Sequence, residues 1–158
     1  FKEKKQKFFS YLCAKVSKEK NKLKESLKTH KDYLKDFERV FNRFIRERDR
    51  GLPCVSCGQL PPFTLSAGHY FPAGSNPSVR FDERNVHGQC WFNCNKNKHG
   101  NQANYYPELV QRIGSEQYEL LATKARQESV KLTIPEIQDL IEQYKQKTKA
   151  LCKQRTTT

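Results

Sequence analysis

The spacing of the cysteines is the clearest chemical signal in the chain. Four of the six cysteines form two close pairs, Cys54-x2-Cys57 and Cys90-x3-Cys94. A tetrahedral zinc ion takes four thiolates, and short turns of this kind supply them two at a time. A disulfide scaffold would instead spread its cysteines through the loops of a secreted protein. We therefore expect these four side chains to bind a structural Zn²⁺ in a reducing cytoplasm.

The sequence leaves one alternative open for the zinc ligands. A Cys3His site would use His87 or His69 in place of one thiolate, because neutral imidazole is also a common zinc ligand. The remaining cysteines, Cys13 and Cys152, are isolated in lysine-rich segments with helical character. We interpret both of them as small apolar packing residues.

A second set of residues has types that suit phosphodiester hydrolysis. His69 lies in a strand-like stretch, Asn95 directly follows the last cysteine of the second pair, and His99 comes four residues later. Residues four apart share one face of a helix, so an amide oxygen and an imidazole nitrogen would point at one ion there. A neutral His69 would take a proton from water while the cation stabilises the phosphorane and the leaving oxygen.

The order of these motifs resembles that of HNH (ββα-metal) endonucleases with a four-cysteine zinc site. The segments that carry the resemblance are Cys54-Val-Ser-Cys57, Ala67-Gly-His69-Tyr70, Asn85-Val-His-Gly-Gln-Cys90 and Cys94-Asn95-Lys-Asn-Lys-His-Gly-Asn101. Together with Phe41-Asn-Arg-Phe-Ile-Arg-Glu-Arg-Asp-Arg-Gly-Leu-Pro-Cys54, they are similar to the phage lambda NinG/Rap recombination endonucleases, from about Phe37 to about Leu151. The segment before Phe37 does not carry the resemblance.

The resemblance implies a role for each residue of the motif. His69 matches the general base that activates water, and Asn85 matches the residue that braces the loop carrying this histidine. Asn95 matches a metal ligand, and His99 lies where some members place a further metal-binding histidine. Gly68 departs from the pattern, because many members have an Asp or His ligand there. Each role also has an ordinary structural alternative. His69 would be a packed histidine, Asn95 a helix cap and His99 a surface histidine.

The departure at Gly68 leaves a catalytic cation with few ligands from the chain. Asn101, Asp82 or Glu83 would complete the set, or water and a substrate phosphate would do so. Oxygen-rich ligation suits Mg²⁺ or Mn²⁺. The candidate contacts to substrate phosphates are Arg80, Arg84, Lys96 and Lys98.

Mainly helices are predicted around these motifs. Residues 1–50 have helical character with a break near Thr29, where a Thr-x-x-Asp pattern starts a second helix. An apolar stripe marks this second helix, which ends at Gly51. The last helix begins at a capping box, Thr133-Ile-Pro-Glu136, and carries a second stripe to about Lys153. Further helices are predicted over 107–113 and 115–126.

The centre of the chain is expected to contain short strands around 63–65, 69–71 and 79–81, and a short helix over 94–101. The predicted fold is therefore α+β and helix-rich overall, with a small ββα-metal (HNH, or His-Me finger) zinc module flanked by long N-terminal and C-terminal helices. We divide the chain into a basic helical arm (1–50), the zinc-stabilised nuclease module (51–104) and a C-terminal helical segment (105–158).

The chain is short and strongly basic. It has 158 residues and a net charge of +13, and residues 1–50 alone carry 17 basic and 8 acidic side chains. Such an arm would attract a polyanion. No run approaches the roughly 18 apolar residues of a membrane helix, and no signal peptide is visible. These features argue against an integral membrane protein and against a metabolic enzyme with a large core. Because the sequence begins with Phe, we expect the native N-terminus to be missing.

From the residues and the resemblance, we expect a metal-dependent, structure-selective DNA endonuclease acting on branched recombination intermediates such as Holliday junctions and displacement loops. The alternative is a zinc-stabilised DNA-binding accessory module that cuts nothing, and structured RNA is a weaker candidate target. A symmetric junction favours a homodimer, for which the two striped helices would provide the interface. We expect a phage or prophage protein in the cytoplasm of a bacterial host, with recombination proteins as further partners and no membrane contact.

Overall fold

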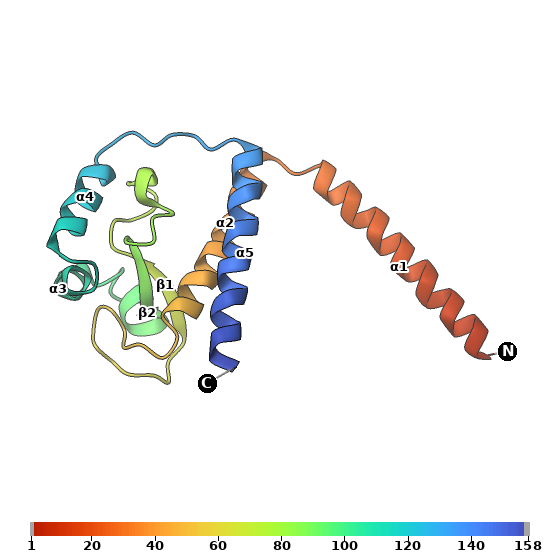
Figure 1. Cartoon of the computed structure of the whole chain (residues 1–158), viewed down its shortest axis with the longest axis horizontal. Coiled ribbons are helices and arrows are strands. Elements are labelled where there is room, and N and C mark those ends of the chain that lie inside the picture. Colours follow the sequence, from red (N-terminus) through yellow and green to blue (C-terminus); the bar gives the residue numbers. More distant parts are fainter. Residues whose placement is uncertain (1, 157–158) are drawn as a thin grey trace.

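Two pairs of helices enclose a short β-hairpin in the computed structural model, which describes the backbone of residues 2–156 (Figure 1). The elements are, in chain order, α1 (Lys2–Ser26), α2 (His30–Arg48), β1 (Leu65–His69), the 3-10 helix η1 (Pro77–Val79), β2 (Val86–Cys90), the π-helical turn η2 (Trp91–Lys96), α3 (Gln102–Ile113), α4 (Ser115–Ala125) and α5 (Ile134–Thr156). The helix-rich α+β class predicted from the sequence is therefore confirmed.

Capping residues set the helix boundaries where the sequence predicts them. Thr29 and Asp32 form a reciprocal capping box at the start of α2, which confirms the break in the N-terminal helical segment. At the start of α5, the Thr133 N–H donates to the Glu136 carboxylate at 2.7 Å, and the Glu136 N–H donates to the Thr133 hydroxyl at 3.4 Å. Gly114 separates α3 from α4 with a φ of +84°, a conformation that favours glycine.

The strands differ from the prediction, which placed them at 63–65, 69–71 and 79–81. β1 and β2 form an antiparallel hairpin in which Leu65 lies opposite Cys90 and His69 lies opposite Val86. The predicted pieces overlap β1 only at its ends, and Val79 belongs to η1 instead of a strand. All five residues of β2 are buried. Its sequence, Val-His-Gly-Gln-Cys, contains a glycine and two polar residues, so it lacks the run of apolar residues that would mark a buried strand.

The apolar stripes of α2 and α5 face each other and form the main hydrophobic core. The ring of Tyr144 in α5 lies 5.7, 5.2 and 5.1 Å, between centroids, from the rings of Phe37, Phe41 and Phe44 in α2. Val86 of β2 joins the same cluster, so the core also holds the hairpin against α2. Because both stripes are buried within one chain, they do not offer the surface on which the homodimer prediction relied.

Helices α3 and α4 lie on the other side of the hairpin (Figure 1), and they carry a second set of apolar contacts. Val55 packs with Tyr105 and Leu109 of α3, and Val79 of η1 packs with Leu121 of α4. Full burial of an apolar side chain of this size contributes about 1.5–3 kcal/mol. The hairpin is thus held between the α2–α5 pair and the α3–α4 pair.

Helix α1 stands away from the rest of the described structure (Figure 1). Within residues 2–156 it packs against no other helix or strand. Only α1 therefore has the form of an arm, whereas α2, which the sequence-based division places in the same arm, belongs to the core. None of the described helices is long and apolar enough to cross a membrane.

A buried ion pair fastens the end of α2 to β2. The Asp49 carboxylate is 3% exposed, accepts the Gly88 N–H at 2.6 Å and pairs with the Arg48 guanidinium at 2.7 Å. Arg48 also donates to the carbonyls of Glu83 and Val86, at 3.0 and 2.8 Å. Burial opposes ionisation of Asp49, but the interaction with Arg48 and the Gly88 N–H outweigh it and hold the pKa of Asp49 below its usual range.

We expect Asp49→Ala to lower the free energy of unfolding by about 3–5 kcal/mol, because Arg48 and the Gly88 N–H would lose a buried partner. Urea unfolding followed by circular dichroism measures this loss. Asp139→Ala is the control, since Asp139 is exposed on α5, and it should change stability by less than about 0.5 kcal/mol. Equal stability of the two variants would contradict the anchoring role of Asp49.

Candidate functional site

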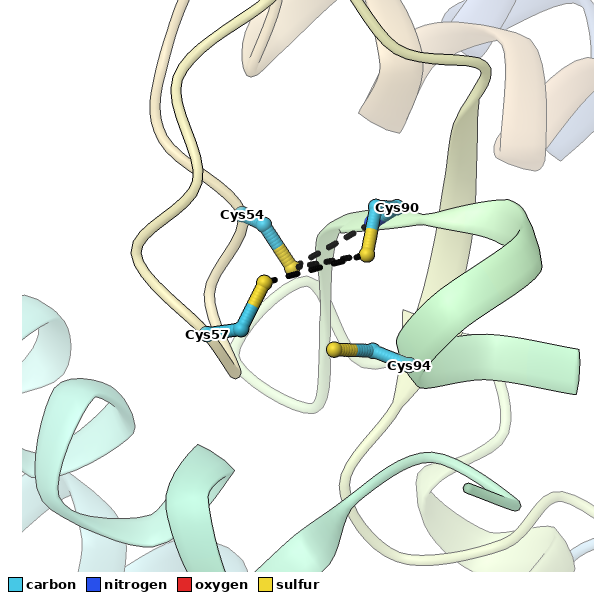
Figure 2. Close-up of side chains that lie close together, drawn as sticks. All are labelled: Cys54, Cys57, Cys90 and Cys94. Carbon is cyan, nitrogen blue, oxygen red and sulfur yellow. Dashed lines mark hydrogen bonds between the residues drawn. The ribbon is translucent and has the colours of Figure 1, made fainter. Parts of the chain in front are cut away.

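Four cysteine sulfur atoms converge where the turn that contains Cys54 and Cys57 meets the end of the hairpin (Figure 2). All four lie within 4.8 Å of one another. The Cys90 sulfur is 3.6 Å from that of Cys54 and 3.8 Å from that of Cys57. Sulfurs bound at about 2.3 Å to a tetrahedral zinc ion would be about 3.8 Å apart. The cluster therefore fits a structural Zn²⁺, and the predicted grouping of these cysteines is confirmed.

Three segments bring these sulfur atoms together. Cys54 and Cys57 lie in one turn, Cys90 ends β2, and Cys94 lies within η2. The Cys90 N–H donates to the Cys54 sulfur at 3.3 Å. Burial opposes ionisation of Cys54, yet backbone N–H donors around its sulfur lower its pKa overall, whereas burial raises the pKa of Cys94. Backbone donors of this kind favour a thiolate, which is the form that binds a metal.

Neither histidine of the alternative Cys3His site belongs to the sulfur cluster. His87 is buried, with Nδ1 3.2 Å from the Tyr105 hydroxyl, and that hydroxyl donates to the Gly68 carbonyl at 3.0 Å. The His87 Nδ1–H is therefore the donor to Tyr105. Burial, reinforced by nearby Arg48, lowers the pKa of His87 to about 3. A neutral, packed His87 thus connects the hairpin to α3.

His69 ends β1, and one defined hydrogen bond holds its imidazole. Nε2 lies 2.8 Å from the Arg80 carbonyl, and because a carbonyl only accepts, this nitrogen carries the proton. Nδ1 then carries the lone pair and has no hydrogen-bond partner among the described residues. Burial lowers the pKa of His69. The ring is therefore neutral at neutral pH, which is the form that a general base requires.

Asn85 holds together the loop that connects the two strands. Its Oδ1 accepts the Phe71 N–H at 2.8 Å, and its Nδ2 donates to the carbonyls of Phe71 and Val79, both at 3.0 Å. The side chain is fully buried. Since Val79 directly precedes Arg80, Asn85 also fixes the backbone that supplies the hydrogen-bond acceptor of His69.

The segment after Cys94 differs from the predicted helix over 94–101. η2 begins at Trp91, three residues before Cys94, and its Asn97 N–H donates to the Phe92 carbonyl at 3.1 Å, the i to i−5 bond of a π-helix. The chain leaves the helix before His99, whose φ is +48°. Asn95 and His99 therefore do not share a helix face.

The absence of an acid or histidine before His69 has a steric reason. A Cβ on Gly68 would collide with the Gln89 side chain, lying 3.0 Å from its Cβ and closer still to its Oε1. Gln89 is fully buried, and its Nε2 donates to the Ser56 hydroxyl at 2.5 Å and to the Gly100 carbonyl at 2.6 Å. Gln89 thus ties the cysteine turn to the segment after η2. Sequence reasoning missed this residue because a single Gln beside Cys90 matches no motif.

The four candidate phosphate contacts separate into two groups. Arg84 pairs with Asp82 at 2.8 Å and also donates to Gln117 at 2.9 Å, while Arg80 pairs with Glu38 at 2.9 Å. Both arginines therefore stabilise the fold. Lys96 and Lys98 are exposed and make no ion pair within the described part of the chain. These two lysines remain available for a phosphate.

Comparison with known proteins places this helix-rich α+β chain, with its four-cysteine centre beside a hairpin, in a bacteriophage family. The family model described as "Bacteriophage Lambda NinG protein" matches residues 2–154. The chain belongs to this NinG family. No solved structure gives a significant match.

Several curated relatives carry the name Protein ninG, and three of them illustrate the similarity. The one from Escherichia phage 933W is 40% identical over 135 residues, covering 85% of this chain and 66% of that protein. The one from Escherichia phage lambda is 41% identical over 128 residues, 81% of this chain and 61% of that protein. The Salmonella phage P22 protein is 47% identical over 91 residues, 58% of this chain and 44% of that protein. The chain thus spans less than two thirds of these relatives.

We expect purified protein to contain about one zinc per chain, and Cys54→Ser or Cys90→Ser to lose both the metal and cooperative folding. A structural zinc contributes folding energy directly, so the melting temperature should fall by about 10 °C or more, a few kcal/mol in a chain of this size. Metal analysis and thermal unfolding measure both effects. Cys13→Ser, at an exposed cysteine, is the control. Unchanged stability in Cys54→Ser and Cys90→Ser would mean that these cysteines do not bind a structural metal.

Stability should also depend on the neutral state of His87. Its pKa is about 3 in the folded chain and about 6.5 when unfolded, so below pH 6.5 the unfolded state binds a proton that the folded state does not. Unfolding free energy should therefore fall as the pH is lowered from 7 to 5, by up to about 1.4 kcal/mol per unit from this group. His87→Gln should flatten the slope, measured by urea unfolding at each pH. An unchanged slope would contradict the burial argument.

Proposed function

We propose that this protein is an HNH-type endonuclease that hydrolyses phosphodiester bonds in branched DNA with the help of a divalent cation. The observation that carries the proposal is the state of His69, a neutral imidazole at the end of a strand, with a defined tautomer and an Nδ1 that has no partner among the described residues. The order of hairpin, η2 turn and helix α3 beside four clustered cysteines is compatible with a ββα-metal module.

His69 would act as the general base. Its Nδ1 takes a proton from the attacking water, and the Arg80 carbonyl, 2.8 Å from Nε2, stabilises the imidazolium that forms. Asn85 positions this acceptor through its bond to the neighbouring Val79 carbonyl at 3.0 Å. General-base catalysis by a positioned side chain contributes typically 10²–10⁴-fold to a rate.

The divalent cation would supply charge stabilisation at the reacting phosphate when it is bound. Half-buried Asn95 and exposed His99 are the side chains with which the chain would hold it. The four cysteines are the one converging group of three or more His, Cys, Asp or Glu residues in the described chain. Substrate phosphate and water would therefore complete the shell, as is common for Mg²⁺, and Mn²⁺ would suit the same oxygen ligands.

The remaining charge suits a DNA backbone. α1 and the basic last turn of α5 would contact phosphates without reading sequence, because phosphate contacts carry no sequence information directly. Holliday junctions and displacement loops are the proposed substrates, cut as part of DNA recombination in the host cytoplasm. A homodimer and recombination proteins are the proposed partners, and any dimer contact has to use surfaces other than the α2–α5 stripes.

One observation favours a second candidate, a zinc-stabilised DNA-binding module that cuts nothing. Gln89 fills the space that a ligand at position 68 would need, so the chain offers few donors to a catalytic cation. Cleavage that depends on a divalent ion separates the two candidates, because the binding module would hold branched DNA without cutting it.

The test is incubation of purified protein with a four-way DNA junction and a matched linear duplex in Mg²⁺ or Mn²⁺. We expect the junction to be cut, and His69→Ala to slow cleavage at least about 100-fold. His30→Ala is the matched control, because the His30 Nε2 also meets a backbone carbonyl, that of Leu132 at 2.7 Å, on a different part of the chain. This control should cut like the unaltered protein.

Two results would contradict the proposal. Junction binding with no divalent-dependent cleavage would support the accessory module. Cleavage that survives His69→Ala while metal content and melting temperature are unchanged would rule out His69 as the base.

A further inference from the structure

Two large aromatic side chains are exposed between the cysteines of the second pair. Trp91 is 46% exposed and Phe92 is 62% exposed. Neither residue has a part in the hydrolysis proposed above. Large aromatic residues dominate the energetics of cores and interfaces because they bury 150–250 Å² each. Two of them left in solvent on one short turn therefore indicate a surface that binds something.

The backbone beneath these two rings is firmly held. Cys90 precedes Trp91 and Cys94 follows Phe92 by two residues, so a zinc ion in the cluster would anchor both ends of the turn. The Trp91 N–H donates to the Thr64 carbonyl at 2.8 Å, which extends the hairpin ladder by one bond. The extra residue of the second cysteine pair is accommodated in the π-helical turn, a geometry often found at functional sites.

The charged residues on either side of the two rings along the chain are of one sign. Residues 84–107 contain no Asp or Glu, but they include the exposed cations Lys96 and Lys98. The Lys96 Nζ lies 5.9 Å from the centroid of the Phe92 ring. Aromatic faces interleaved with lysines suit nucleic acid, in which apolar base faces alternate with phosphates. An acidic protein partner would pair with the lysines, but its carboxylates would not account for two exposed rings.

We propose that Trp91 and Phe92 form a stacking platform for unstacked bases at a DNA branch point, with Lys96 and Lys98 on the adjoining phosphates. In a linear duplex the bases are stacked on each other, so their faces are not available to the platform. At a branch or in a single strand the base faces are available. Stacking on a protein ring contributes about 1–3 kcal/mol per base. This inference rests on the proposed DNA substrate and explains how a branch would be distinguished from a duplex.

The platform lies at the opposite end of the hairpin from His69. Trp91 adjoins Thr64, and five residues at about 3.4 Å each separate Thr64 from His69 along β1, or about 17 Å. The platform would therefore contact a different part of the substrate from the scissile phosphate. Recognition of the branch and hydrolysis are then separable by mutation.

Trp91 is the only tryptophan in the sequence, so its fluorescence reports directly on the platform. The protein is titrated, without added Mg²⁺ or Mn²⁺, with a four-way junction, a single strand and a linear duplex of the same sequence. We expect the junction and the single strand to quench the fluorescence, and the duplex to leave it nearly unchanged. Equal quenching by all three DNAs, or by none, would overturn the proposal, and the second result would favour a protein partner for this surface.

Variants test the affinity itself. Phe92→Ala and Trp91→Ala should weaken junction binding about tenfold or more, with little change for the duplex, and Trp91→Phe should restore junction binding because phenylalanine also stacks. Phe9→Ala is the matched control, since Phe9 is 70% exposed on α1, and it should leave the preference for the junction unchanged. An unchanged preference in Phe92→Ala and Trp91→Ala, with normal melting temperatures, would contradict the platform.

The outcome is independent of the nuclease proposal. His69→Ala should keep the fluorescence response in full. Quenching by junctions without any cleavage by the unaltered protein would leave the platform in place and exclude the nuclease. Cleavage by the unaltered protein without quenching would support the nuclease and contradict the platform.

Discussion

The convergence of four sulfur atoms within 4.8 Å of one another is the constraint on which the centre of this protein depends. It joins the turn at Cys54, the end of β2 and the η2 turn, which have little apolar material of their own. A two-stranded hairpin is marginal by itself, and a short module gains from a metal the stability that its core does not supply. The positions of the Cys54–Cys57 turn and of η2 beside the hairpin follow from this point of attachment.

Helical packing supplies the rest of the support for the hairpin. The α2–α5 pair holds one side through Val86, and α3 and α4 cover the other. Three of the polar side chains buried between these layers have defined partners. Asp49 accepts the Gly88 N–H, Asn85 bonds to the backbone of Phe71 and Val79, and the Tyr105 hydroxyl joins His87 to the Gly68 carbonyl. A buried polar group without a partner is costly, so these bonds fix a unique register as well as contributing stability.

The candidate chemistry and the candidate recognition surface use the same frame in different ways. His69 is buried enough to be neutral, while Trp91 and Phe92 are exposed on a turn whose backbone is held at both ends. A rigid support suits both tasks, since a base must be held within hydrogen-bond reach of its proton and a rigid ring loses little entropy when it stacks. Helix α1, which is basic and packs on no other described element, stands apart from this frame.

The sequence alone determined what depends on local spacing: the zinc cysteines, the capped starts of α2 and α5, and the helix-rich class. Capping and ligand spacing act over a few residues, so they are visible without a fold. The position of β2, the packing of α2 on α5 and the end of the helix before His99 were decided only by tertiary structure. β2 is buried on both faces although it contains a glycine and two polar residues, so its sequence does not mark it as a buried strand. An apolar stripe does not identify the element that it packs against. Gln89 excludes a larger residue at position 68 only because the two strands pair in this register, and no single stretch of sequence specifies the pairing.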